Sequence, residues 1–215
     1  MVQKSDLAFE YLKQRIINGE LAPLSSISEK EIQSKLETSR TPVREALLKL
    51  QELGFIYIYP NRGTIVSELT LDLIEEMYEA RLLNEGEAYV SSAKVIKENE
   101  LQSFRTRFLA HADEVGGANR IYYIELDDEL HDTLLSHCPN RFIRRSLQMV
   151  YDHNRRLRRF VTEPISVPEH IEIIDAMLSK DEKRIRNAVL THLVGSKNHT
   201  MNSYRLGELK SLQIK

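Results

Sequence analysis

The sequence SRTPVREALLKLQELGFIYIYPNRGTIV, residues 39–66, decides the fold of the N-terminal third of the chain. Its first half predicts a helix over residues 39–53, because apolar side chains recur near the 3.6-residue period of a helix. These side chains are Val43, Ala46, Leu47, Leu50 and Leu53. Pro42 falls in the first turn, where a helix has amides without partners, and Gly54 is a natural end for the helix.

The second half of the same stretch predicts a β-hairpin. Residues 55–59 and 64–68 contain many β-branched and aromatic side chains, and Pro-Asn-Arg-Gly joins the two runs. A four-residue turn of this composition between two such runs is typical of a hairpin. A β-ribbon, or wing, is therefore expected directly after the helix.

Two further helices are expected upstream. One covers about residues 5–18 and ends at Gly19. Its expected buried side chains are Leu7, Tyr11, Leu12, Ile16 and Ile17. The other opens at Ser28, which is predicted to form a capping box with Glu31. Three short helices and a hairpin in this order are typical of a winged helix-turn-helix, and a generic small α+β domain is the alternative.

The composition is that of a helical globular protein. Of 215 residues, 41% are hydrophobic and 29% are charged, with 8 Gly and 6 Pro, which excludes a collagen-like or largely disordered chain. A single cysteine excludes a disulfide framework and favours a reducing compartment, the cytoplasm. No segment has the apolar length of a signal peptide or a transmembrane helix, so no membrane partner is expected.

The net charge does not identify a partner. The 30 basic and 32 acidic residues give a formal charge of −2, whereas a nucleic-acid-binding protein often carries an excess of basic residues. A nucleic-acid site must therefore be argued from the places of individual charges and not from their number.

The rest of the chain is predicted to be an all-α domain of residues 70–215, which follows a first domain of residues 1–69. Six helices are expected, at about 70–95, 98–114, 119–137, 140–161, 167–179 and 181–203. Glycine and proline mark the breaks between several of them. Long helices with short connections pack as an antiparallel bundle, so the fold class is mainly α.

Residues 28–66 resemble the DNA-binding domain of GntR-type bacterial transcription regulators, most densely in the string SRTPVREAL. The resemblance implies that the third helix enters the major groove of double-stranded DNA and that the wing approaches the minor groove. The implied DNA-binding residues are Lys30, Ser39, Arg40, Thr41, Arg44, Arg62 and Gly63.

The chemistry of these residues fits that role. Arg40 and Arg44 are four residues apart, so both project from one face of the helix, opposite its apolar stripe. Guanidinium groups there bind guanine O6 and N7 or clamp phosphates, while Ser39 and Thr41 offer hydroxyls and early helix amides to phosphate oxygens. In the alternative, both arginines are solvated helix charges, with Arg44 paired to Glu31 or Glu45.

The chain departs from the family pattern at two places. Glu37-Thr38 stands where the family usually has Gly-Val, and Lys30 stands where relatives commonly carry arginine. If Glu37 takes a left-handed turn conformation, the strain is about 1 kcal/mol. Lys30 cannot form the planar fork of an arginine, which weakens a bidentate contact at this position.

The second domain resembles the FCD effector-binding domain of the FadR branch, in its six-helix VanR-like form. The residues that carry the resemblance are Asp127, His131, His170 and His192, together with Arg81 and Glu85 in the first helix of the bundle. In relatives, the corresponding aspartate and three histidines bind a divalent metal beside the effector pocket. Arg81 is expected to clamp the carboxylate of a small effector.

The positions of these residues are compatible with a metal site. Asp127 and His131 are four residues apart on one helix face, and His170 and His192 fall on faces that carry apolar residues. Three imidazoles and one carboxylate suit a divalent metal, Zn or Ni, with Fe or Mn possible. Any one inward histidine is more often a hydrogen-bonded core residue, so the prediction depends on the combination.

The function expected from these features is a ligand-responsive transcription regulator. It would bind a palindromic operator as a homodimer, because the symmetry of the protein mirrors that of the DNA. Two alternatives use the same residues differently. One is a metal-dependent hydrolase or isomerase with the Asp/His cluster on the metal, and the other is a DNA-binding scaffold whose bundle only dimerises.

Overall fold

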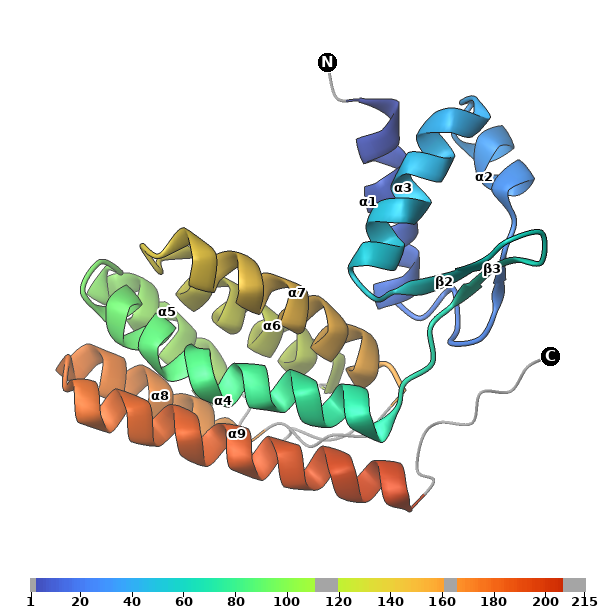
Figure 1. The fold of residues 1–215 in the computed structure, drawn as a ribbon. Helices are drawn as coiled ribbons and strands as arrows, with labels where there is room; N and C mark the ends of the chain where they lie inside the picture. Colours follow the sequence, from blue (N-terminus) through green and yellow to red (C-terminus); the bar gives the residue numbers. More distant parts are fainter. Residues whose placement is uncertain (1–2, 111–119, 161–165, 207–215) are drawn as a thin grey trace. The chain divides into compact units, whose positions relative to one another are not determined.

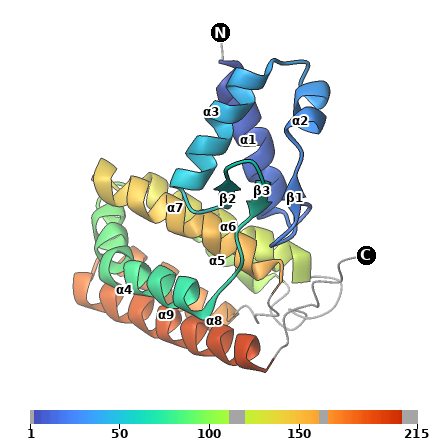
Figure 2. The same ribbon diagram turned by 45° about the vertical axis from the view of Figure 1, so that its right-hand side comes forward.

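The structure is a computed structural model, and it describes residues 3–110, 120–160 and 166–206. The described chain forms two compact units. One contains residues 3–70 with 152–160, and the other contains residues 71–110 and 120–151 with 166–206. The first combines helices with a small sheet, whereas the described part of the second is helical (Figures 1 and 2).

The first unit is a winged helix-turn-helix. It contains the helices α1 (Lys4–Ile17), α2 (Glu29–Lys35) and α3 (Arg40–Glu52), and the strands β1 (Ser26–Ile27), β2 (Ile56–Tyr59) and β3 (Gly63–Val66). The strands form one antiparallel sheet in the order β1-β3-β2, in which Ile65 pairs with Ser26 on one side and Tyr57 on the other. The predicted helices and hairpin are confirmed, but β1 was not predicted, because two residues are too short to show a period.

The core of this unit lies where α1 packs along α3. Val43, Leu47 and Leu50 are buried, as the spacing of the third helix predicted. The prediction for Leu7 was wrong, because this side chain is 53% exposed and Ala8 takes the buried position on α1. Each residue of a helix is rotated by about 100° from its neighbour, so an error of one position moves a side chain out of the core.

The turn between α2 and α3 contains a strained residue. Glu37 has φ of 46°, in the left-handed region that favours glycine. The expected strain at this position is therefore present, and it costs about 1 kcal/mol. The carbonyl of Glu37 accepts a hydrogen bond from Lys4 Nζ at 3.2 Å, and α3 begins three residues later.

The second unit is a bundle of long helices. It contains α4 (Leu71–Ala93), α5 (Glu98–Leu109), α6 (Arg120–Ser136), α8 (Val167–Ser179), α9 (Glu182–Arg205) and residues 141–151 of α7 (Arg141–Arg158). Helix α9 packs against α4 and α8, and α6 packs against α4 and α5 (Figure 1). Six helices and the mainly α fold class are confirmed, and the predicted helical positions 111–114, 119 and 161 lie outside the described residues.

The apolar core of the bundle encloses several ionisable side chains. They are Arg81, Glu85, Asp127, His131, His170 and His192. Such groups are seldom fully buried without a partner, so their presence in the core indicates a site. None of the helices in the described part of the chain combines the length and the apolarity that a membrane span requires.

Candidate functional site

The first candidate site is the exposed beginning of α3. Arg40 and Arg44 lie in its first two turns, with side chains 63% and 56% exposed. Both guanidinium groups donate through Nε to the same oxygen, Oε2 of Glu29, at 3.0 Å for Arg40 and 3.4 Å for Arg44. The partner of Arg44 is therefore Glu29, and not Glu31 or Glu45 as the alternative interpretation proposed.

The other predicted DNA-binding residues of this helix are also at the surface. Ser39 and Thr41 are exposed, and the side chain of Ser39, the N-cap, makes no capping hydrogen bond. The first turn of α3 contains no acidic residue, so no side chain of this turn neutralises the positive N-terminal end of the helix dipole. An anion such as a phosphate can bind at a helix end of this kind.

The remaining predicted residues lie on α2 and on the wing. Lys30 is exposed beside Glu29, and both line a cleft of about 400 Å³ that also includes Arg40. Arg62 and Gly63 are exposed at the turn of the hairpin, where the Arg62 amide donates to the carbonyl of Tyr59 at 3.0 Å. All of these groups are accessible to a large ligand.

The second candidate site is a cluster of histidines inside the bundle. His131 of α6, His170 of α8 and His192 of α9 each offer one ring nitrogen, and the three nitrogens lie within 4.8 Å of one another. Asp127 joins them, because its Oδ1 lies 2.6 Å from Nε2 of His170 and 3.8 Å from Nε2 of His131. The structure thus brings together the four residues that the sequence analysis selected.

Each of the three histidines is held through its other ring nitrogen, Nδ1. His170 Nδ1 lies 2.8 Å from the carbonyl of Ser166, and His192 Nδ1 lies 3.1 Å from Oε2 of Glu169. His131 Nδ1 contacts two groups of α4, a hydroxyl and a carboxylate. This arrangement leaves Nε2 for a metal, and oxygen partners on Nδ1 are the usual means of orienting a metal-binding histidine.

The partners of His131 come from α4. The hydroxyl of Tyr89 hydrogen-bonds Nδ1 of His131, and a carboxylate oxygen of Glu85 lies 3.3 Å from the same atom. Tyr89 also contacts the hydroxyl of Tyr151 at 3.1 Å. Arg81, Glu85 and Tyr89 follow one another at intervals of four residues, so this stripe was visible in the sequence, although Tyr89 was not selected.

The donor atoms of the cluster fit a metal. Nε2 of His170 is buried and has no hydrogen-bond partner among the described residues, although Asp127 Oδ1 is only 2.6 Å away. A buried polar atom of this kind is costly unless something else binds it. Burial lowers the pKa of His192 to about 4, so its imidazole is neutral, which is the form that binds metals. Three nitrogens and one carboxylate oxygen suit a divalent transition metal.

Arg81 is buried next to the cluster and is already paired. Its Nε and Nη2 donate to the two carboxylate oxygens of Glu85 at 2.8 and 3.2 Å. The guanidinium also lies over the rings of Tyr78 and Tyr151, at 5.5 and 5.6 Å from the ring centres. The expected clamp for an effector carboxylate therefore holds an internal carboxylate, and an effector would have to share Arg81 with Glu85.

The charge state of Glu85 follows from this pairing. Burial alone would raise its pKa, but the charge of Arg81 and the hydrogen bond from His131 outweigh burial, so the pKa of Glu85 lies well below its usual value. Burial also raises the pKa of the Tyr89 and Tyr151 hydroxyls, which therefore stay neutral. The site offers one internal ion pair with neutral phenols around it.

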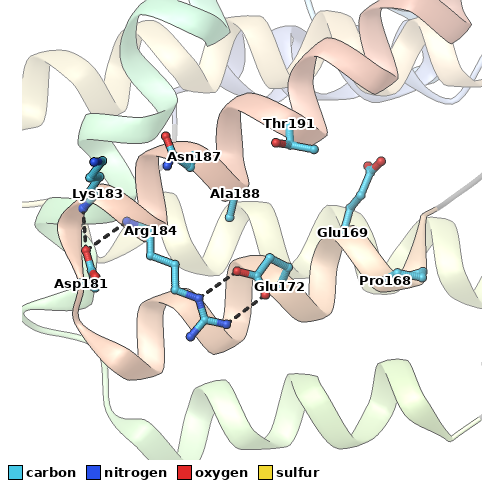
Figure 3. A pocket seen from close by; sticks show the side chains of 9 residues that line it. All are labelled: Pro168, Glu169, Glu172, Asp181, Lys183, Arg184, Asn187, Ala188 and Thr191. Carbon is cyan, nitrogen blue, oxygen red and sulfur yellow. Dashed lines mark hydrogen bonds and ion pairs between the residues drawn. The ribbon is translucent and has the colours of Figure 1, made fainter.

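A groove lies between α8 and α9, and one of its lining residues, Glu169, also contacts the cluster. Its volume is about 540 Å³, and Figure 3 shows nine side chains along it. Arg184 is paired there with both oxygens of Glu172, at 2.8 and 2.9 Å. Glu169 lies at another part of the groove and is the residue whose carboxylate also holds His192. Ser166 and Glu169 were not selected from the sequence; Ser166 acts through its backbone carbonyl, and the role of Glu169 depends on a contact between α8 and α9.

Comparison with protein families gives two matches. A family described as bacterial regulatory proteins, gntR family, matches residues 4–66, and the FCD domain matches residues 76–195. Among curated proteins, the HTH-type transcriptional repressor RspR of Escherichia coli K12 is 25% identical over 190 residues, which are 86% of this chain and 83% of that protein. The Nta operon transcriptional regulator of Aminobacter aminovorans is 27% identical over 173 residues, 80% and 82% of the two chains.

Two solved structures have the same fold. Escherichia coli McbR/YncC matches with a TM-score of 0.77 and 19% identity, over 95% of this chain and 100% of that chain. A GntR transcriptional regulator from Rhodococcus sp. RHA1 matches with a TM-score of 0.75 and 22% identity, over the same shares. At these identities the likeness concerns the fold alone.

Proposed function

We propose a function on the premise that this chain belongs to the gntR family of bacterial regulatory proteins and carries an FCD domain. The protein is a transcription regulator, as are the relatives to which it is similar. In our proposal it binds a palindromic DNA operator as a homodimer. It responds to a small carboxylate that binds beside a divalent metal in the second unit.

The observation that carries the DNA-binding proposal is the exposed pair Arg40 and Arg44 at the beginning of α3. Two guanidinium groups on one face of a narrow helix can reach base edges in the major groove. The acid-free first turn and the hydroxyls of Ser39 and Thr41 supply contacts to phosphates on the same helix. Lys30 is proposed as a further contact to the DNA, and Arg62 and Gly63 are proposed to approach the minor groove from the wing.

The metal proposal is supported by the donor set and its surroundings. Asp127, His131, His170 and His192 would hold the ion, which we propose to be Zn or Ni, with Fe or Mn as the other candidates. When bound, the metal would supply open coordination positions for an oxygen ligand. Arg81 would contribute a positive charge beside it, shared with Glu85.

The proposed mechanism is a shift between two conformations. An effector that binds one packing of the bundle more tightly than another moves the population toward that packing. If the two packings also differ in affinity for the operator, effector and DNA change each other's affinity by the same factor. Since the named relatives are transcription regulators and not enzymes, a metal-dependent hydrolase or isomerase is not favoured.

DNA binding is tested by selecting duplexes from a random pool with the purified protein. We expect enrichment of an inverted repeat whose half-sites are about one helical turn, roughly 10 base pairs, apart. Light scattering of the complex should give two chains for each duplex. Failure to enrich any sequence would count against the proposal.

The metal site is tested by elemental analysis of the purified protein and of the variant His131→Ala. The variant should lose its metal, with an affinity lower by more than about 100-fold, because removing a ligand costs more than removing an outer partner. It should still bind the selected duplex in the metal-free form. His199→Ala is the matched control on α9, and a full metal content in His131→Ala would mean that the ligands are wrongly assigned.

A further inference from the structure

Glu29 is the acidic residue that the two DNA-facing arginines share. It lies in the first turn of α2, directly after the N-cap Ser28, whose hydroxyl accepts the amide of Glu31 at 3.3 Å. Its side chain is 27% exposed, which is less than half the exposure of Arg40 or Arg44. The carboxylate is thus the more enclosed partner, and the two guanidinium groups are the more accessible ones.

The contact with Glu29 involves only the Nε atom of each arginine. Both arginines donate through Nε, at 3.0 and 3.4 Å from the same Oε2 atom. Within the described residues, the terminal nitrogens Nη1 and Nη2 of Arg40 and Arg44 have no hydrogen bond. A guanidinium that is held by Nε still presents its two terminal nitrogens as a fork, and this fork fits O6 and N7 of guanine.

The shared carboxylate also changes how the two arginines affect each other. Arg40 and Arg44 are four residues apart on one helix, and like charges at this spacing repel. A single negative charge that both contact opposes the repulsion and restricts the rotamers of two long side chains. Exposed ion pairs add little to folding stability, so the larger consequence is for orientation before DNA is bound.

We propose that Glu29 is a positioning residue for DNA reading, an inference that rests on the DNA-binding function proposed above. By holding Nε of both arginines, it directs their terminal nitrogens toward base edges and keeps them from binding phosphates in many orientations. Its negative charge at the same time lowers affinity for any phosphate backbone. Glu29 therefore raises the ratio of specific to non-specific binding at some cost in total affinity.

Two substitutions test separately the charge of the Glu29 side chain and its length. Glu29→Gln removes the charge that holds both guanidinium groups on one oxygen, and Glu29→Asp keeps the charge but is one methylene too short for the same contact. Glu31→Gln is the matched control, since Glu31 lies two residues away on α2 and has no contact with either arginine among the described residues. Glutamine also retains the capping-box pattern at that position.

The experiment measures the affinity of each variant for two duplexes by fluorescence anisotropy at several salt concentrations. One duplex is the sequence that the wild-type protein enriches from a random pool, and the other is a scrambled duplex of the same composition. For Glu29→Gln we expect tighter binding of the scrambled duplex and a specificity ratio that falls about tenfold. Glu29→Asp should bind the scrambled duplex as the wild type does, with a reduced ratio.

The control variant should behave differently. Glu31→Gln should bind both duplexes slightly more tightly and leave the ratio unchanged, because it changes only the charge. If Glu29→Gln changes both affinities by the same factor, or if Glu29→Asp keeps the full ratio, Glu29 acts through charge alone and the positioning role is wrong. If the wild-type protein enriches no sequence at all, DNA binding itself fails and this inference falls with it. Equal melting temperatures of the variants verify that all are folded.

Discussion

An arginine–glutamate contact occurs in both candidate sites, and the two contacts differ in almost every physical respect. At the start of α3, Glu29 serves two arginines that are more than half exposed. In the bundle, Glu85 serves a single Arg81, and the side chains are 0% and 2% exposed. The first contact is surrounded by water and the second by tyrosine rings and an imidazole.

The difference shows that burial decides whether an arginine–glutamate pair can also bind a ligand. Water and salt screen the exposed pairs, so these pairs add little to folding stability and leave the terminal nitrogens of the arginines available for a ligand. A buried pair cannot lose one partner without leaving a charge in the apolar core. The surface site can thus keep its internal partner on Nε while the terminal nitrogens of its arginines bind DNA, whereas the buried site is fixed by its own contacts.

The largest expected effect is on the stability of the buried pair. Glu85→Ala should lower the free energy of unfolding by about 3–5 kcal/mol, because Arg81 would remain buried without a counter-charge. Glu29→Ala, the same change at the surface, should cost less than about 1 kcal/mol. Denaturant unfolding of the chelator-treated protein measures both.

A double variant is the control for the buried pair. Arg81→Met with Glu85→Leu removes both charges and should be more stable than Glu85→Ala alone, because apolar side chains can replace a buried ion pair. If Glu85→Ala and Glu29→Ala lower the free energy of unfolding equally, burial does not distinguish the two sites.

The second expected effect is on DNA binding. Arg44→Ala should weaken binding of the selected duplex by about 1–3 kcal/mol, since it removes a side chain proposed to contact a base. Lys49→Ala lies further along α3, and Lys49 is paired with Asp6 at 2.8 Å, so it should change this affinity little. A mobility-shift titration compares the two, and an unchanged affinity of Arg44→Ala would remove the base-contact role.

The third expected effect is on the metal affinity of the buried histidine cluster. Glu169→Gln should weaken metal binding about 10–100-fold, as is usual when the outer partner of a metal-binding histidine is changed. Competition with a chelator measures this affinity, and nitrogen NMR of the metal-free protein reports whether the proton of His192 stays on Nδ1. Glu172→Gln is the control on the same helix, where the carboxylate contacts Arg184. If both variants bind metal equally well, Glu169 does not orient His192.

The smallest expected effect concerns the turn that precedes the DNA-facing helix. Glu37→Gly should raise the free energy of unfolding by up to about 1 kcal/mol, because glycine adopts a positive φ without strain. Lys35→Gly, two residues earlier in the last position of α2, should have the opposite effect and cost up to about 1 kcal/mol. Thermal unfolding measures both, and a loss of stability in Glu37→Gly would mean that the turn is not strained.

Local patterns in the sequence predicted most of the fold. The helices and the wing were predicted because each has several turns of periodic apolar residues or a run of β-branched ones, with Gly or Pro at the ends. Strand β1 was missed because Ser26 and Ile27 are too few to form a pattern. Leu7 was wrongly expected to be buried, because Leu7 and Ala8 are both apolar and only packing decides which of them faces the core.

The candidate site residues were predictable where spacing along one helix relates them. Asp127 and His131, or Arg81 and Glu85, are four residues apart and share a face whatever the rest of the chain does. The resemblance to a known family added His170 and His192 from other helices. The roles of Glu169 and Tyr89 could not be predicted in this way, since their histidine partners lie 23 and 42 residues away.

By itself, the sequence determined which segments are helices or strands and which polar side chains share a helix face, because both follow from the regular geometry of a single element. Only the tertiary structure decided that Glu29 is the partner of Arg40 and Arg44, 11 and 15 residues away, and that the Arg81–Glu85 pair is buried in the core. The choice of partner depends on which elements meet in space. The strength of the contact depends on how much water remains around it. A pattern along one element predicts neither the burial of a contact nor a partner on another element.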